Sequence, residues 1–291
     1  MLKLRVITAL VLLPLALYTI LFLGNQSFAA VIGVVTLIAA YEWAGFAKFP
    51  SVLAKLAYVV IIATVIYSLW LINFVISPMV MNAVSAGFWL LALLLIFAYP
   101  GSASFWKDRP PMIAVLGIIL LTMTWYSLTA IHAISAVQIG EGQISGPYLV
   151  LSVMMLVWAA DTGAYFSGRR FGKNKLAPAI SPGKSREGVY GGMLLALFIA
   201  LVFALWNNAG MQDYLYITGI SLVTVIFSVA GDLMESMFKR QANLKDSGNI
   251  LPGHGGILDR IDSVTAAAPV FYIALSLTYL HDAPLTLLNT H

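Results

Sequence analysis

The feature that most limits the fold of this chain is a series of apolar runs, each close to 20 residues long. A helix needs about 20 consecutive apolar residues to cross the roughly 30 Å hydrocarbon core of a bilayer. Such runs cover approximately residues 6–23, 28–46, 52–73, 82–98, 112–134, 148–167, 189–206, 214–231 and 263–280. Only 10% of the residues are charged, against roughly 25% in a soluble domain. The sequence therefore predicts an all-α, polytopic integral membrane protein with about nine transmembrane helices.

The first apolar run follows "MLKLR" and resembles the start of a secretory signal. The apolar core of a signal peptide is usually about 7–15 residues long. The run here extends over about 18 residues, counted from the printed sequence, so we expect a retained span.

The positions of the basic residues test the number of spans. If the N-terminus is cytoplasmic, nine spans place all 16 Lys and Arg residues on the cytoplasmic side. The opposite connections, "GNQS", "NFVISPMVMN", "SAVQIGEGQISG" and "NNAGMQD", contain none, as the positive-inside rule requires. We expect a cytoplasmic N-terminus, an external C-terminus, and chemistry or binding on the cytoplasmic face.

The chain divides into two regions of different character. Residues 1–146 hold about five spans joined by short connections, and residues 147–291 hold longer cytoplasmic connections, at 168–188 and 239–262. Cysteine is absent, which excludes disulfides, thiolate metal sites and a cysteine nucleophile. In the first region, Glu42 is either a functional carboxylate or a solvated interfacial one, and His132 is interpreted as a packed or interfacial side chain.

The first polar cluster of the second region begins with Asp161, inside an apolar run. A carboxylate there costs about 2.5–3.5 kcal/mol at a helix centre, so we expect it to have a partner. The basic residues that follow could determine membrane topology and bind anionic lipid. The Gly, Pro and Ser residues between them nevertheless favour phosphate binding. "GKS" at 183–185 resembles the end of a P-loop, yet position 178 is proline and no strand is expected before it, which excludes that motif.

The second cluster ends the eighth span, in "SVAGDLMESMFKR". On a helix, Asp232, Glu235, Ser236 and Lys239 share one face. An interfacial ion pair with Lys239 would explain part of this stripe, whereas the carboxylates also suit Mg²⁺.

The third cluster is "LKDSGNILPGHGGILDRID", residues 244–262, which contains too much Gly and Pro to be helical. Asp262 could cap a helix that begins at Ser263 or join a metal site. Asp259 has no such structural task, and a short connection would bring it close to Asp232 for joint metal binding. His254 could be a general base, a phosphate contact or a structural donor.

Residues 236–262 resemble the signature of the CDP-diacylglycerol synthases (phosphatidate cytidylyltransferases). The matching positions are Ser236, Lys239, Arg240, Lys245, Asp246, His254, Gly255, Gly256, Asp259, Arg260 and Asp262. The segment "DTGAYFSGRRFGKNKLAPAISPGKSREG" resembles a second block of that family, which usually has lysine where this chain has Gly183. The likeness covers roughly residues 155–265, and the first half resembles the family only as a run of spans.

The resemblance implies transfer of the cytidylyl group of CTP to phosphatidate, giving CDP-diacylglycerol and pyrophosphate in phospholipid biosynthesis. It implies catalytic roles for Asp232, Asp259, Lys239 and Arg260. The implied substrate-binding residues are Lys184, Ser185, Arg186, Ser236, Arg240, Lys245, Asp246, His254, Gly255 and Gly256. For Mg²⁺, and a second cation if there is one, we expect Asp232 and Asp259, with Asp161, Glu235 and Asp262 as further candidates.

Two other functions stay open at this point. A transporter of an anionic solute would also have many spans and intramembrane acids, although here the acids cluster at span ends in the second half and no repeat is visible. A CTP-dependent kinase of a lipid alcohol would need a base for the hydroxyl. The expected partners are CTP, phosphatidate and membrane lipid, with no nucleic acid; a homodimer is a further possibility.

Overall fold

The computed structural model describes residues 2–71, 77–253 and 255–280, with side chains from residue 10 onward and at Thr8. Its helices are α1 (Leu2–Phe22), α2 (Asn25–Phe46), α3 (Val52–Leu71), α4 (Pro78–Phe97), α5 (Pro110–His132), α6 (Gly146–Phe171), α7 (Arg186–Trp206), α8 (Met211–Ala242) and α9 (Leu258–Thr278). By length and composition, α2 to α9 can each cross a membrane. The chain is therefore an all-α polytopic membrane protein, as predicted, and every predicted span coincides with a helix.

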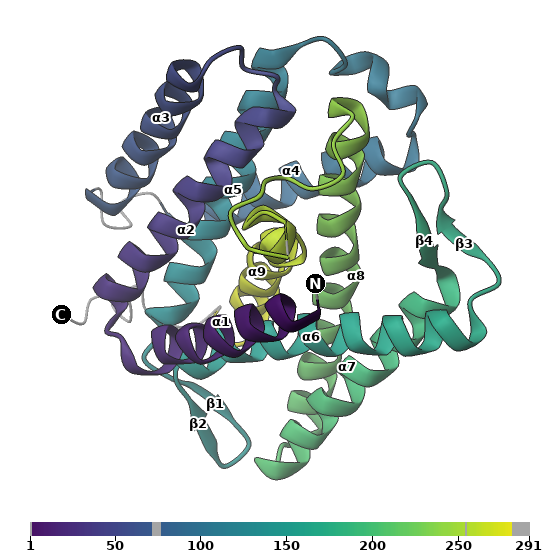
Figure 1. Cartoon of the computed structure of the whole chain (residues 1–291). Helices are drawn as coiled ribbons and strands as arrows, with labels where there is room; N and C mark the ends of the chain where they lie inside the picture. Colours follow the sequence, from purple (N-terminus) through teal and green to yellow (C-terminus); the bar gives the residue numbers. More distant parts are fainter. Residues whose placement is uncertain (1, 72–76, 254, 281–291) are drawn as a thin grey trace.

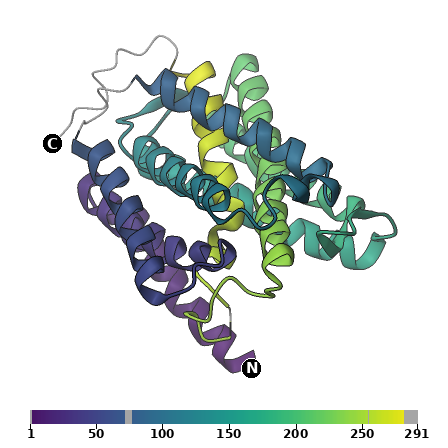
Figure 2. The ribbon, with the colours of Figure 1, turned by 90° about the horizontal axis from the view of Figure 1, so that it is seen from above.

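Helix α9, the last helix among the described residues, lies at the centre of the molecule (Figure 1) and packs against α2, α4, α5, α6 and α8. Its approach to α8 is close, since a Cβ atom on Gly231 would lie 2.4 Å from the carbonyl oxygen of Asp262. Viewed from above, α2 and α3 lie on one side of α9 and α8 on the other (Figure 2). Helices of both sequence halves therefore surround the segment that follows the third polar cluster.

The connections contain strands that the sequence analysis did not predict. Strands β1 (Val137–Ile139) and β2 (Gly142–Ile144) form one antiparallel hairpin, and β3 (Lys175–Ala177) and β4 (Ser181–Ser185) form another. A short 3₁₀ helix, η1 (Gly101–Phe105), follows α4. The predicted connection 168–188 is thus shorter than expected, because α6 continues to Phe171 and α7 begins at Arg186.

The expectation that no strand precedes "GKS" is wrong, because β3 does. Residues 183–185 nevertheless lie within strand β4 rather than in a loop before a helix. The conclusion that this segment is not a P-loop therefore holds.

The connections gather at two opposite ends, as an alternating up-and-down path requires. At one end Gln241 contacts Tyr99, Arg240 contacts Ile180, and Ser247 contacts Glu42. At the other end Glu141 contacts Asn207, Gly140 and Tyr279 contact Asp213, and His132 contacts Asn25. The Lys and Arg residues from 48 to 260 lie in the connections at the first end or in the helix turns next to them. The side chains of Lys3 and Arg5 lie outside the described residues.

His132 is buried, as the sequence analysis expected. It is stacked on Phe28 with ring centroids 4.0 Å apart, and its ring nitrogens contact Asn25 and the carbonyl of Ile20. Its place is structural.

The ninth helix begins five residues earlier than the sequence predicted, at Leu258. The interpretation of Asp262 as the cap of a helix starting at Ser263 is therefore wrong. Asp262 lies in the second turn of α9, where its carboxylate accepts a hydrogen bond from the Ser263 amide at 2.7 Å. Residues 243–253 and 255–257 are non-helical, as their Gly and Pro content predicted.

Candidate functional site

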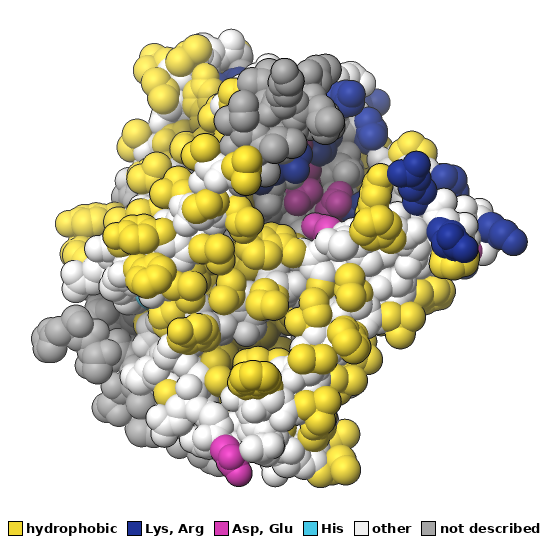
Figure 3. Space-filling view, turned by 60° about the horizontal axis from the view of Figure 1, so that its bottom comes forward, with side chains coloured by type: hydrophobic (Ala, Val, Ile, Leu, Met, Phe, Trp, Pro, Cys, Tyr) yellow, Lys and Arg dark blue, Asp and Glu magenta, His cyan; other side chains and the backbone are white. Residues whose placement is uncertain are grey.

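A cavity of about 410 Å³ opens between α6, β4, α7 and α8, at the end of the molecule that carries the basic connections. Its polar lining includes Asp161, Arg169, Lys184 and Asp232, and the apolar residues Val225 and Val229 also line it. Figure 3 shows carboxylates in a recess at one end of a largely apolar surface, with Lys and Arg side chains beside them. The cavity thus joins both charge signs at an interface between polar and apolar surroundings.

Lys184 on β4 and Asp232 on α8 form an ion pair across this cavity. Their side chains keep 26% and 27% of their accessible surface. Ser236, one turn after Asp232, donates a hydrogen bond to its other carboxylate oxygen at 3.3 Å. Because the pair remains open to the cavity, an incoming anion can compete with Asp232 for the ammonium group.

Asp161 lies on α6 in the same cavity, exposed, and within electrostatic range of Asp232, Lys184 and Arg260. Among the described residues it makes no direct ion pair or hydrogen bond. The charged partners of Asp161 are Lys184 and Arg260, which act on it through space rather than through a direct contact.

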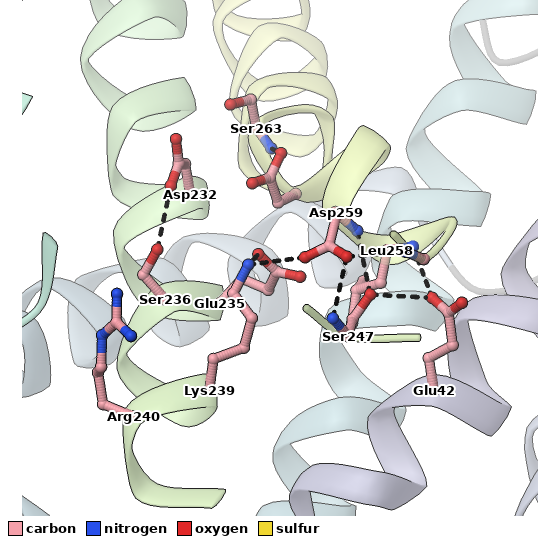
Figure 4. A network of polar contacts seen from close by, with 12 residues as sticks. Glu42, Asp232, Glu235, Ser236, Lys239, Arg240, Ser247, Leu258, Asp259 and Ser263 are labelled. Atoms are coloured by element: carbon pink, nitrogen blue, oxygen red, sulfur yellow. Dashed lines mark hydrogen bonds and ion pairs between the residues drawn. The ribbon is translucent and has the colours of Figure 1, made fainter. Parts of the chain in front are cut away.

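The predicted stripe on α8 is present, and Lys239, at its end, connects it to α9 (Figure 4). The ammonium group of Lys239 lies 2.6 Å from Glu235 and 2.7 Å from Asp259 of α9. Glu235 is only 3% exposed, and neither of its oxygens receives a well-directed hydrogen bond from a described residue. One cation therefore balances two enclosed carboxylates from two helices.

The carboxylate of Asp259 also holds the connection between α8 and α9 in place. Its second oxygen accepts hydrogen bonds from the amides of Ser247, at 2.9 Å, and Gly256, at 2.8 Å. Gly255 has φ +82°, and a Cβ atom there would lie 2.7 Å from this oxygen. Glycine is thus needed at position 255 both for the left-handed backbone and for the close approach to Asp259.

Glu42, from α2, is the residue of this network that the sequence analysis placed least well. It is 4% exposed, so its interpretation as a solvated interfacial carboxylate is wrong. It accepts hydrogen bonds from the Ser247 hydroxyl and from the amides of Ile257 and Leu258. The only signal in the sequence was an acidic residue inside an apolar span, and Ser247 itself gave none.

The remaining predicted residues occupy varied positions. Ser185 caps α7 by accepting a hydrogen bond from the Gly188 amide at 3.1 Å, and the Nε of Arg240 donates to the Ile180 carbonyl at 3.0 Å. Arg186, Lys245, Asp246 and Arg260 are exposed. His254 lies outside the described residues. Lys245 and Asp246 are thus accessible to solutes, whereas Ser185 and Arg240 serve the local structure.

The donor set of the site suits a divalent cation, although its ligands are not gathered in one shell. Within residues 2–71, 77–253 and 255–280, no three His, Cys, Asp or Glu side chains lie in a ligand arrangement. Asp232 and Asp259 flank the Lys239–Glu235 pair rather than sharing a point (Figure 4). The under-bonded oxygens of Glu235 and the exposed carboxylate of Asp161 are nevertheless hard donors of the kind that Mg²⁺ takes, so the residues fit such an ion in type.

An apolar cleft of about 350 Å³ adjoins the polar cavity. The two share Val189 and Val229 as a common wall, and Phe97, Pro178, Ile226 and Leu233 are among the other lining residues of the cleft. Phe97 is 83% exposed, so the cleft opens to the apolar surface of the molecule. A molecule with a charged head and an apolar tail could occupy both spaces.

Comparison with known proteins agrees with this arrangement. The sequence is 41% identical to the phosphatidate cytidylyltransferase of Haemophilus influenzae, over 93% of this chain and 97% of that protein. It is 43% identical to the enzyme of the same name from Pseudomonas aeruginosa, over 93% and 96% of the two chains. The Bacillus subtilis phosphatidate cytidylyltransferase is 48% identical over a shorter region, 42% of this chain. Residues 3–278 match the cytidylyltransferase family, and the chain belongs to that family.

Proposed function

We propose that this protein is a phosphatidate cytidylyltransferase, which transfers the cytidylyl group of CTP to phosphatidate and releases pyrophosphate. The observation that carries this proposal is the polar cavity with its Lys184–Asp232 pair, set against an apolar cleft. A phospholipid substrate needs both environments, and a nucleotide needs access from solution. The family membership and the names of the two relatives with near-complete coverage support the same activity.

In the reaction, an oxygen of the lipid phosphate forms a bond to the α-phosphorus of CTP, and the bond from that phosphorus to the β-phosphate oxygen breaks. Both nucleophile and leaving group are already anionic, so charge neutralisation and positioning matter more than proton transfer. Lys184, with the exposed Arg186, Lys245 and Arg260, would attract the phosphates. Lys239 would fix the facing ends of α8 and α9 through its two carboxylate partners.

A bound Mg²⁺ would neutralise phosphate charge and hold the nucleotide in line for attack. Asp232 and Asp161, which line the cavity, fit this role together with Asp262 and Glu235. Asp259 uses both oxygens within the protein. It would therefore bind a cation only by releasing Lys239 or a backbone amide.

We further propose that the site faces the cytoplasm of a bacterium and that the protein lies in its inner membrane. The basic residues at the site end support this orientation through the positive-inside rule. A second copy of the chain as partner remains a proposal that the oligomeric state in detergent would test.

The test uses purified full-length protein with Mg²⁺ and CTP labelled on either the α- or the γ-phosphate. We expect the α-label to move to the lipid phase with phosphatidate and not with a lipid alcohol. Transfer of the γ-label to a lipid alcohol would indicate a kinase instead. Absence of labelled lipid with either substrate would contradict the proposed activity and favour transport of an anionic solute.

A further inference from the structure

Glu42 lies in the first half of the chain, outside the region that resembles the family signature, yet its carboxylate is part of the polar network in Figure 4. We propose that Glu42 is a positioning residue, which sets the Asp259–Lys239 pair through Ser247. The proposal rests on the proposed function, because it assigns Glu42 to the same active site.

The contacts form a continuous path from α2 to the ion pair. The Ser247 hydroxyl donates to Glu42 at 3.1 Å and accepts from the amide of Asp259 at 3.3 Å. The Ser247 amide in turn donates to the Asp259 carboxylate, whose other oxygen contacts Lys239. Ser247 is therefore clamped between two carboxylates, and a shift of Glu42 moves both.

The carboxylate of Glu42 also fixes the start of α9. The Ile257 amide donates to it at 3.1 Å and the Leu258 amide at 2.8 Å. These groups belong to the first turn of a helix, whose amides lack partners within the helix and carry partial positive charge. Asp259 follows directly, so the same contact orients the backbone that carries it.

The backbone of two glycines packs closely against this carboxylate. A Cβ atom on Gly248 would lie 2.3 Å from a Glu42 oxygen, and one on Gly256 would lie 2.5 Å from both. The three described groups that contact Glu42 are donors, and a carboxylate offers them acceptor oxygens only. Glutamine keeps the shape but directs an NH₂ group at one of these donors, so the substitution tests charge and acceptor capacity with little change in volume.

If Glu42 only capped α9, its substitution would change thermal stability, and that effect would not depend on Ser247. The experiment therefore compares Glu42→Gln, Ser247→Ala and the double variant in full-length protein, with Glu141→Gln as the matched control. Glu141 is an exposed residue at the opposite end of the molecule. Steady-state kinetics gives kcat and the KM for CTP, and hydrogen exchange of residues 247–258 is measured without CTP, lipid or Mg²⁺.

We expect Glu42→Gln to lower kcat about 10- to 100-fold, as the loss of a supporting contact behind a functional residue does. The KM for CTP should stay within about threefold, because neither Glu42 nor Ser247 lines the cavity. In the double variant, kcat should fall little further than in Glu42→Gln, since both residues act along one path. Exchange of the 247–258 amides should be faster in Glu42→Gln, and the control should match the wild type in every readout.

Wild-type kcat in Glu42→Gln, losses that multiply in the double variant, or unchanged exchange at 247–258 would each overturn the proposal. If Glu42→Gln fails to fold, Ser247→Ala decides alone, and an unchanged kcat there overturns it. An inactive wild-type protein would instead contradict the proposed function, while the exchange measurement would still test the positioning.

Discussion

Two Lys–Asp pairs lie on either side of the end of α8, and they differ in almost every respect except composition. The Lys184–Asp232 pair joins a hairpin to α8, lines a cavity and keeps about a quarter of its surface exposed. The Lys239–Asp259 pair joins two helices, with exposures of only 14% and 8%, and contacts Glu235 and two backbone amides besides. The Lys184–Asp232 pair can therefore exchange partners with a ligand. The Lys239–Asp259 pair instead holds α8, α9 and their connection together, and we call it the frame.

This difference shows that ion pairs of the same residue types have different roles, depending on how far their side chains are buried. An exposed ion pair contributes little to stability, about 0–1 kcal/mol. Removal of one member of a buried pair costs about 3–5 kcal/mol, because the partner is left uncompensated. The predictions below separate the frame from the cavity on this basis.

The largest effect on activity is expected for Asp259→Asn. The amide would place a donor against Lys239 or against the Ser247 and Gly256 amides, so the geometry of the site would be lost. We expect kcat to fall by at least about 100-fold while the protein still inserts into the membrane. Initial rates with CTP and phosphatidate, with size-exclusion chromatography as the control for folding, check this. Turnover near that of wild type would show that the site does not depend on Asp259.

The next effect concerns stability and compares Lys239→Ala with Lys184→Ala. The first leaves Glu235 and Asp259 enclosed without a cation, so it should destabilise by about 3–5 kcal/mol. The second leaves an accessible Asp232, so it should cost less than about 1 kcal/mol. Thermal unfolding in one detergent measures both, and equal losses would show that the two pairs do not differ as frame and cavity.

Lys184→Ala should then act mainly on substrate. The ammonium group faces the cavity, so its loss should raise the KM for CTP or phosphatidate about 10-fold or more, in line with the 1.5–3 kcal/mol of a charged hydrogen bond. Measured KM values for both substrates identify which phosphate it meets. Unchanged KM values for both would contradict its assignment to substrate binding.

The smallest effect is expected for Arg240→Gln. Its Nε already donates to the Ile180 carbonyl, so the variant should lose one hydrogen bond, worth about 1 kcal/mol. We therefore expect the KM for CTP to change less than about fivefold. A rise beyond 10-fold would restore Arg240 as a direct phosphate contact, as the family resemblance implies.

Hydropathy and charge placed the spans well, because both act locally along the chain. Each apolar run became a helix, and the stripe from Asp232 to Lys239 lies on one face as its spacing predicted. The start of α9 was misplaced because "ILDRID" is polar, and polarity was taken for a loop although Leu258 begins the helix.

Contacts between distant helices had no such local signal. The Glu42–Ser247 contact joins residues 205 positions apart, and neither hydropathy nor spacing relates them. The ion-pair partner of Asp232 could not be predicted either, because Lys184 lies on a hairpin that the sequence analysis did not predict. Tertiary packing, rather than local pattern, decides which charges meet.

The central place of α9 has a consequence for how the protein is made. Synthesis delivers the N-terminal helices to the membrane first, so α2, α4, α5, α6 and α8 are inserted before the helix they surround exists. Until residues 247–258 emerge from the ribosome, Glu42 lacks all three of its described donors within an apolar environment. Insertion of α9 therefore supplies both the centre of the bundle and the donors of Glu42, so one helix completes the core and the polar network.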